Sequence, residues 1–102
     1  MPKLNISVTH NLPQDEALRR IKNLLTELKR KFANDIRNLR ERWNGNAGNF
    51  SFLVRGFSAS GTLTVRRGTV ELSLNIPLAA LPLKGKIEST IRRRAGLLLS
   101  GS

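Results

Sequence analysis

The segment TLTVRRGTVELSLNI, residues 62–76, decides the fold of this chain. Leu63 and Val65 alternate with polar residues in its first half, and four apolar residues alternate with polar ones in its second half. Such alternation predicts β-strands that bury one face. Arg67 and Gly68 separate the two runs, and glycine supplies the positive φ that a tight turn requires. The segment therefore predicts a β-hairpin.

Three more strands are expected outside this hairpin. The runs from Leu4 to Thr9 and from Phe50 to Arg55 alternate in the same way. A third strand is expected from Arg37 to Trp43, and the turn-rich residues 44–48 close it. The chain is thus expected to form about five strands.

Two helices are expected beside these strands. The first runs from Pro13, which suits a first helical turn, to the mid-thirties, and Asp15 and Glu16 lie where carboxylates favour the helix dipole. Its apolar residues share one arc of about 120°; they are Ala17, Leu18, Ile21, Leu24, Leu25, Leu28, Phe32 and Ile36. The second helix covers about residues 82–99, with an inner stripe of Leu83, Ile87, Ile91, Ala95 and Leu98. Burial is expected for Ile21, Leu25, Leu28, Phe32, Ile87 and Ile91.

The order β-α-β-β-β-β-α predicts an α+β fold in a single domain of residues 1–102. Each strand has one apolar face and each helix one apolar stripe, so an antiparallel sheet with both helices on one face buries them together. This outline is helix-grip-like, and the pattern leaves the strand order open. The second face of the sheet, rich in serine, threonine and arginine, is expected to face water or a partner.

Composition sets further limits. Eighteen lysines and arginines against seven acidic residues give a net charge of +11, which favours a polyanionic partner or serves only to keep the domain soluble. The absence of cysteine excludes disulfides and thiolate zinc sites. No apolar run approaches the ~20 residues of a transmembrane segment, and the amino terminus lacks a signal-peptide core. A cytoplasmic protein is expected.

The first predicted helix carries a candidate polyanion-binding stripe, which consists of Arg19, Lys22, Lys29 and Arg30. Apart from Asp15, which can pair with Arg19, few acidic residues lie beside it, while Glu16 is placed to pair with Arg20. Such a stripe binds phosphates or is an ordinary solvated face. The scarcity of aromatic residues argues against a platform for single-stranded nucleic acid.

The three consecutive arginines 92–94 do not predict an anion site. Successive helical residues are 100° apart, so the three side chains point in different directions. Glu88 precedes Arg92 by four residues, which favours an ion pair. All three lie near a helix carboxyl end, where cations offset the dipole. The triplet is interpreted as helix chemistry.

The sequence does not predict an enzyme. His10 is the only histidine and stands at a strand end, where a structural role is expected. No serine lies in a G-x-S-x-G context, and the carboxylates lack metal-ligand spacing. Neither a cofactor nor a metal is expected.

Several motifs in chain order carry a family resemblance. They are Ile6-Ser7-Val8-Thr9-His10-Asn11-Leu12 with Glu16-Ala17 and Arg20-Ile21, Trp43-Asn44-Gly45-Asn46, Gly61-Thr62-Leu63-Thr64-Val65, and Leu83-Lys84-Gly85-Lys86-Ile87-Glu88 with Ile91-Arg92-Arg93. The chain resembles the small polyhydroxyalkanoic acid system proteins, also called the granule-region family. The resemblance implies an accessory role in bacterial polyester storage and supplies no catalytic residue. The chain departs from the family in its basic residues 37–42.

Two hypotheses of function follow. In the first, a non-enzymatic accessory protein associates with the polyester granule surface or with a granule protein, and Leu97 and Leu99, outside the strict inner stripe, are candidate surface contacts unless they widen the buried face. In the second, the basic stripe binds nucleic acid or another polyanion. An acyl ligand between sheet and helices follows from the helix-grip outline by analogy alone. A homo-oligomer is compatible with either hypothesis.

Overall fold

The computed structural model describes residues 3–31, 33–34, 36–54 and 56–100, without the side chains of Leu28, Lys31, Val54 and Leu83. Its elements follow the predicted order, with one short 3₁₀ helix, η1, added before the second helix. They are β1 (Lys3–Thr9), α1 (Gln14–Lys31), β2 (Ile36–Asn44), β3 (Ala47–Val54), β4 (Phe57–Val65), β5 (Thr69–Asn75), η1 (Leu78–Leu83) and α2 (Lys84–Leu98).

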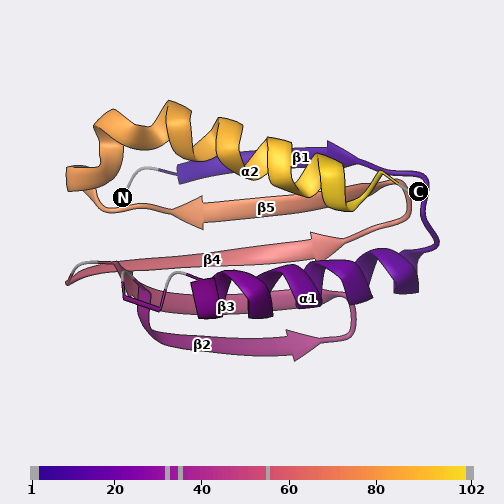
Figure 1. The fold of residues 1–102 in the computed structure, drawn as a ribbon, viewed down its shortest axis with the longest axis horizontal. Coiled ribbons are helices and arrows are strands. Elements are labelled where there is room, and N and C mark those ends of the chain that lie inside the picture. Colours follow the sequence, from indigo (N-terminus) through magenta and orange to yellow (C-terminus); the bar gives the residue numbers. More distant parts are fainter. Residues whose placement is uncertain (1–2, 32, 35, 55, 101–102) are drawn as a thin grey trace.

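The five strands form one antiparallel sheet in the order β1-β5-β4-β3-β2. Strands β2 to β5 follow one another as a meander, and β1 pairs with β5 at the far edge. Both helices lie on the same face, α2 over the β1 side and α1 over β4 and β3 (Figure 1). The predicted α+β architecture is confirmed, and the strand order that the sequence left open is now defined.

The hairpin that decides the fold has the expected register. Val65 pairs with Val70 and Leu63 with Leu72, so their side chains share the face that the helices cover. Gly68 has a φ of +82°, as the turn requires. Strand β4 is longer than the alternation indicated, because it continues back through serine, alanine and glycine residues to Phe57.

The core lies between the sheet and the helices, in two clusters. Ala17, Ile21 and Leu99 pack on β4 and β5 in one cluster, and the second cluster centres on Leu4 and Ile6 of β1. Ile21 is buried as predicted.

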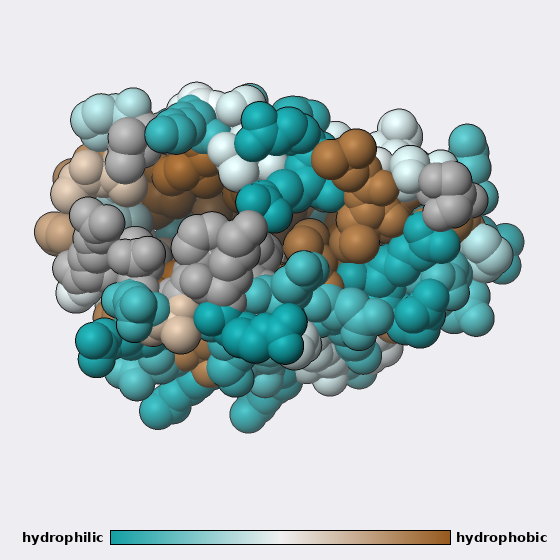
Figure 2. Space-filling model, in the orientation of Figure 1, coloured by the Kyte–Doolittle hydropathy of each residue, from teal (hydrophilic) through white to brown (hydrophobic). Residues whose placement is uncertain are grey.

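Three other side chains expected in the core are only half buried, namely Leu25, Ile87 and Ile91. Leu25 packs against the rim of the first cluster, and Ile87 and Ile91 pack against the rim of the second. The two helices lie side by side on the sheet, with a seam between them (Figure 1). Figure 2 shows hydrophobic surface along this seam. Burial was also predicted for Leu28 and Phe32. The side chain of Leu28 and the whole of Phe32 lie outside the described part of the chain.

The first helix ends at Lys31, before the mid-thirties end that its apolar arc suggested. A turn at residues 33–34 follows, and Ile36 opens β2 instead of continuing the helix. Asparagine at position 34 favours a turn, since its side chain competes for backbone hydrogen bonds. The helical periodicity therefore extended by chance into the strand.

Two glycines let aromatic rings lie flat on the helix-covered face. A Cβ at Gly61 would stand 2.7 Å from the Ser73 carbonyl oxygen and 3.0 Å from the Phe50 ring. A Cβ at Gly48 would stand 2.9 Å from the Trp43 indole. Each glycine is the cross-strand partner of the aromatic residue that it accommodates.

Candidate functional site

The four residues of the predicted basic stripe are all exposed on α1, and the first two also interact with neighbouring side chains. Arg19 is held by the Glu16 carboxylate, and the Lys22 Nζ lies 4.9 Å from the centroid of the Trp43 ring, within cation–π range. Lys29 and Arg30 are exposed about two to three turns further along α1, beside a shallow, open depression at the start of β2. The first two cations thus have partners inside the protein, and the last two stand apart from them.

Glu16 organises the amino-terminal half of α1. It accepts hydrogen bonds from Arg19 and Arg20, and these bonds lower the pKa of the Glu16 carboxyl from about 4.5 to about 2. Arg20 also donates from Nη1 to the Leu98 carbonyl oxygen at 3.0 Å, which satisfies a free carbonyl at the end of α2. The expected Glu16–Arg20 pair is present, and Arg19 pairs with Glu16 instead of Asp15, the partner that the sequence spacing allowed.

One residue of the arginine triplet, Arg92, makes contacts within the fold. Arg92 lies 3.9 Å from Glu88, the pair that the spacing predicted, and its Nη1 donates to the Ser7 carbonyl oxygen at 3.1 Å. Because Ser7 belongs to the edge strand β1, this bond ties α2 to the sheet and occupies an edge carbonyl. Arg93 and Arg94 are exposed.

His10 has the structural role that was expected. Its Nδ1 accepts the Leu12 backbone N–H at 3.1 Å, so in the neutral ring Nε2 carries the proton and donates to the Arg66 carbonyl oxygen at 3.0 Å. The His10 backbone N–H donates to the Gly68 carbonyl oxygen. The buried imidazole therefore joins the end of β1 to the β4–β5 turn.

The two leucines proposed as surface contacts have opposite environments. Leu97 is 72% exposed, whereas Leu99 is 2% exposed and belongs to the core. Leu99 continues the helical spacing, since it follows the buried Ala95 by four residues and its N–H donates to the Ala95 carbonyl oxygen. Leu99 as a surface contact is therefore wrong, and only Leu97 is available to a partner.

The most exposed apolar group lies at the opposite end of α2 from Leu97. We call Phe57, Leu78 and Leu81 the apolar tip; they are 50%, 73% and 44% exposed. Leu78 and Leu81 belong to η1, which follows β5, and Phe57 begins the neighbouring antiparallel strand β4, so all three lie at one end of the sheet (Figure 1). Hydrophobic surface is visible at this end, on the left of Figure 2.

Cations flank the apolar tip. Lys3 begins β1 and Lys84 begins α2, at the same end of the molecule, and both are exposed. Sequence reasoning missed this group because neither strand nor helix periodicity covers η1. The available signal was the apolar run from Leu78 to Leu81, framed by Pro77 and Pro82.

The other face of the sheet carries a second group of charges on β2. Arg37 pairs with Leu53 and Arg40 with Ser51, and the register shifts between them at a bulge where Asn38 has a φ of +56°. Arg37 and Arg40 would otherwise point to opposite faces, because they are three residues apart. The bulge therefore places Arg37, Arg40 and Arg42 on one face, and we call them the arginine row.

The arginine row continues into columns of small polar side chains across the sheet. Arg40 stands in register with Ser51, Ser60, Asn75 and Lys3, and Arg42 with Asn49, Thr62, Ser73 and Asn5. All three arginines are exposed, and no carboxylate within the described residues forms an ion pair with them. Glu71, on the same face, is paired with Arg66 at 3.2 Å.

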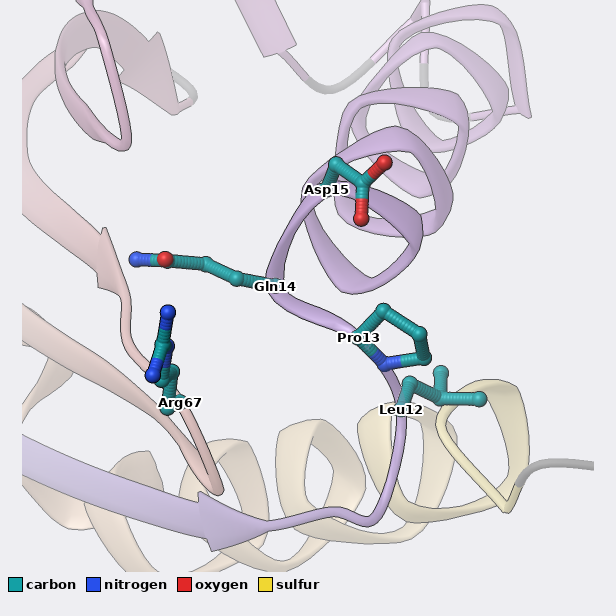
Figure 3. A pocket seen from close by; sticks show the side chains of 5 residues that line it. All are labelled: Leu12, Pro13, Gln14, Asp15 and Arg67. Atoms are coloured by element: carbon teal, nitrogen blue, oxygen red, sulfur yellow. The ribbon is translucent and has the colours of Figure 1, made fainter.

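A second shallow depression lies at the start of α1, between Leu12, Pro13, Gln14, Asp15 and Arg67 (Figure 3). Gln14 reaches toward the β4–β5 hairpin, where its Nε2 donates to the Val65 carbonyl oxygen at 2.9 Å. This contact joins the start of α1 to the β4–β5 hairpin, so the residues around the depression have a structural role.

Neither a metal site nor a membrane-spanning helix is found among the described residues. They contain no cluster of three or more histidine, cysteine or acidic side chains with the geometry of a metal site. None of the helices in this part of the chain has the length and hydrophobicity that a membrane crossing requires.

Comparison with known proteins identifies the family of this chain. A family described as "putative polyhydroxyalkanoic acid system protein" matches residues 4–99, which is nearly the whole chain and includes both the apolar tip and the arginine row. No curated protein and no solved structure matches the chain.

Proposed function

Because the chain belongs to the polyhydroxyalkanoic acid system family, we propose that it serves bacterial polyhydroxyalkanoate storage as a non-enzymatic accessory protein, associated in the cytoplasm with the granule surface or with a granule protein. The observation that carries this proposal is the apolar tip, which exposes two leucines and a phenylalanine at one end of the domain. Exposed apolar groups rimmed by polar residues are typical of interaction sites.

The tip has the chemistry that contact with a hydrophobic polymer requires. Removing apolar surface from water contributes about 25 cal/mol per Å² of buried area, and salt does not screen this contribution as it screens a contact between charges. Residues of η1 are suited to the contact, since the short 3₁₀ helix presents Leu78 and Leu81 outside the packed core.

The flanking lysines supply the second part of the interaction. Lys84, at the start of α2 beside η1, would meet an anionic coat of the granule while the leucines contact apolar material, as at other interfacial sites. Lys3 adds a cation at the same end of the molecule, from the edge of the open face. The electrostatic contribution is screened over a Debye length of about 8 Å at physiological ionic strength. Binding should therefore have a salt-sensitive part and a salt-resistant part.

Co-sedimentation with isolated native granules tests the proposal. We expect the wild-type protein to pellet with granules at low salt and to remain partly bound at high salt. The double variant Leu78→Ser, Leu81→Ser should lose the salt-resistant fraction. Leu97→Ser should have a smaller effect, because Leu97 lies at the far end of α2, roughly 20 Å along the helix from the tip.

The matched control changes the opposite face. Asn49→Ala with Thr62→Ala removes two exposed polar side chains from the open sheet face and should leave sedimentation unchanged. Wild-type protein that stays in the supernatant at low salt would show that direct granule association is wrong. Equal pelleting of the tip variant and the wild type would exclude the tip as the contact.

A further inference from the structure

The arginine row is a group of exposed cations that the granule proposal does not use. It lies on the face of the sheet opposite both helices, whereas the apolar tip is built from η1 and the start of β4. Its three guanidinium groups are exposed and come from one strand, with Arg40 and Arg42 about 7 Å apart along the chain. A regular row of cations along an extended strand is complementary to a polymer of regularly spaced anions.

The neighbouring side chains indicate which anion. Beside Arg40 and Arg42, the next three strands carry serine, threonine and asparagine, including Ser51, Asn49 and Thr62, whereas Arg37 stands opposite Leu53. Together with arginine, these are the residue types that contact phosphate and sugar oxygens in protein–DNA complexes. Glu71 lies on the same face but in β5, away from the arginine row. Its negative charge does not repel an anion bound at the row, because it is paired with Arg66.

Among the described residues, the open face lacks the side chains that would bind single-stranded nucleic acid. Proteins that hold single-stranded nucleic acid without sequence preference stack bases on aromatic side chains. The described strand residues of the open face include no aromatic residue, since Phe50, Phe52 and Trp43 all occupy the helix-covered face. We therefore propose that the arginine row and the adjoining polar columns bind the phosphate backbone of duplex DNA, without reading its sequence.

Binding of this kind has a quantitative signature. Each phosphate that a lysine or arginine neutralises contributes about −0.9 to the slope of log affinity against log salt. If each of the three arginines contacts one phosphate, the variant Arg37→Gln, Arg40→Gln, Arg42→Gln should have a slope flatter by about 2.7. Unrelated duplexes of the same length should bind equally well, because the contacts carry no base information.

The experiment measures fluorescence anisotropy of labelled mixed-sequence duplex DNA between about 50 and 200 mM salt. The control variant Lys86→Gln, Arg93→Gln, Arg94→Gln removes the same charge from exposed positions of α2, on the other side of the molecule. Its slope should remain close to that of the wild type. Both variants should retain the wild-type melting temperature, since all six side chains are exposed.

Each other outcome overturns the proposal. Absence of duplex binding at about 50 mM salt, where the electrostatic contribution is strong, would retire it. Equal flattening in the two variants would mean that net charge, and not the arginine row, attracts DNA. Stronger binding to a single strand than to the duplex would contradict the backbone geometry. Binding to phosphatidylglycerol vesicles but not to DNA would assign the row to a lipid surface.

Discussion

The two faces of the sheet have the same backbone and opposite chemistry. In β1, Leu4 and Ile6 point under α2 and are buried, while Asn5 and Ser7 between them point to the open face and are exposed. The same division continues through β5 and β4. An alternation of period two therefore separates apolar packing from polar contact within single strands.

The division also extends to the surfaces proposed for partners. The helix-covered side carries the incompletely covered seam and the apolar tip, and the open side carries the arginine row. A single bulged residue, Asn38, is needed to bring the row onto one face. Under the two proposals, each side of the sheet has its own partner.

The largest expected effect is a difference in stability between substitutions at two neighbouring residues of β1. Leu4→Ala should lower the free energy of unfolding by about 2–5 kcal/mol, because it removes a side chain that is 1% exposed from the core. Asn5→Ala, on the open face, should change it by less than about 0.5 kcal/mol. Urea unfolding of both variants measures the difference, and similar values would contradict the assignment of the faces.

The next effect on stability comes from a glycine whose backbone is in close contact with its neighbours on the helix-covered face. Gly61→Ala would bring a Cβ within 2.7 Å of the Ser73 carbonyl oxygen, a backbone atom that cannot move freely, and should cost about 1–3 kcal/mol. Gly96→Ala, in α2, meets no atom within 4 Å and should stabilise the protein by about 0.5–1 kcal/mol. Thermal unfolding should thus shift in opposite directions, and a stabilising Gly61→Ala would disprove the packing described for Phe50 and β5.

The smallest expected effect depends on pH. The pKa of Glu16 is lowered in the folded protein, so its ion pairs contribute stability above the ordinary pKa of about 4.5, and this contribution disappears as the pH falls toward about 2. Glu16→Gln should therefore lose less stability than the wild type between these two pH values. Because the pairs are partly exposed, added salt should reduce the difference. Identical pH profiles at low salt would show that the pairs do not form in solution.

Much of the fold could be predicted from the sequence, because most strands expose one face and the alternation is therefore visible. The hairpin at Gly68 and the pairs Glu16–Arg20 and Glu88–Arg92 could also be predicted, because each depends on residues that are close in the sequence. The end of α1 was placed too late, since Ile36 matched the helical arc although it belongs to β2.

The candidate sites were harder to predict from the sequence. The exposure of Leu78 and Leu81 depends on where η1 leaves the sheet, and the burial of Leu99 depends on one further residue of helical spacing after Ala95. The arginine row depends on a bulge at a residue that the sequence does not mark by glycine. Each of these features is set by tertiary geometry, which periodicity within one segment does not specify.

The central claim, that the two sides of the sheet contact different partners, can be tested by one labelling measurement. The chain contains no cysteine, so Leu81→Cys and Asn49→Cys each give a single site for an environment-sensitive fluorophore, one at the apolar tip and one beside Arg42 on the open face. With native granules we predict a blue shift at position 81 and none at position 49. With duplex DNA we predict a spectral change at position 49 and none at position 81. A granule-induced blue shift at position 49, or equal responses at both positions, would contradict the account.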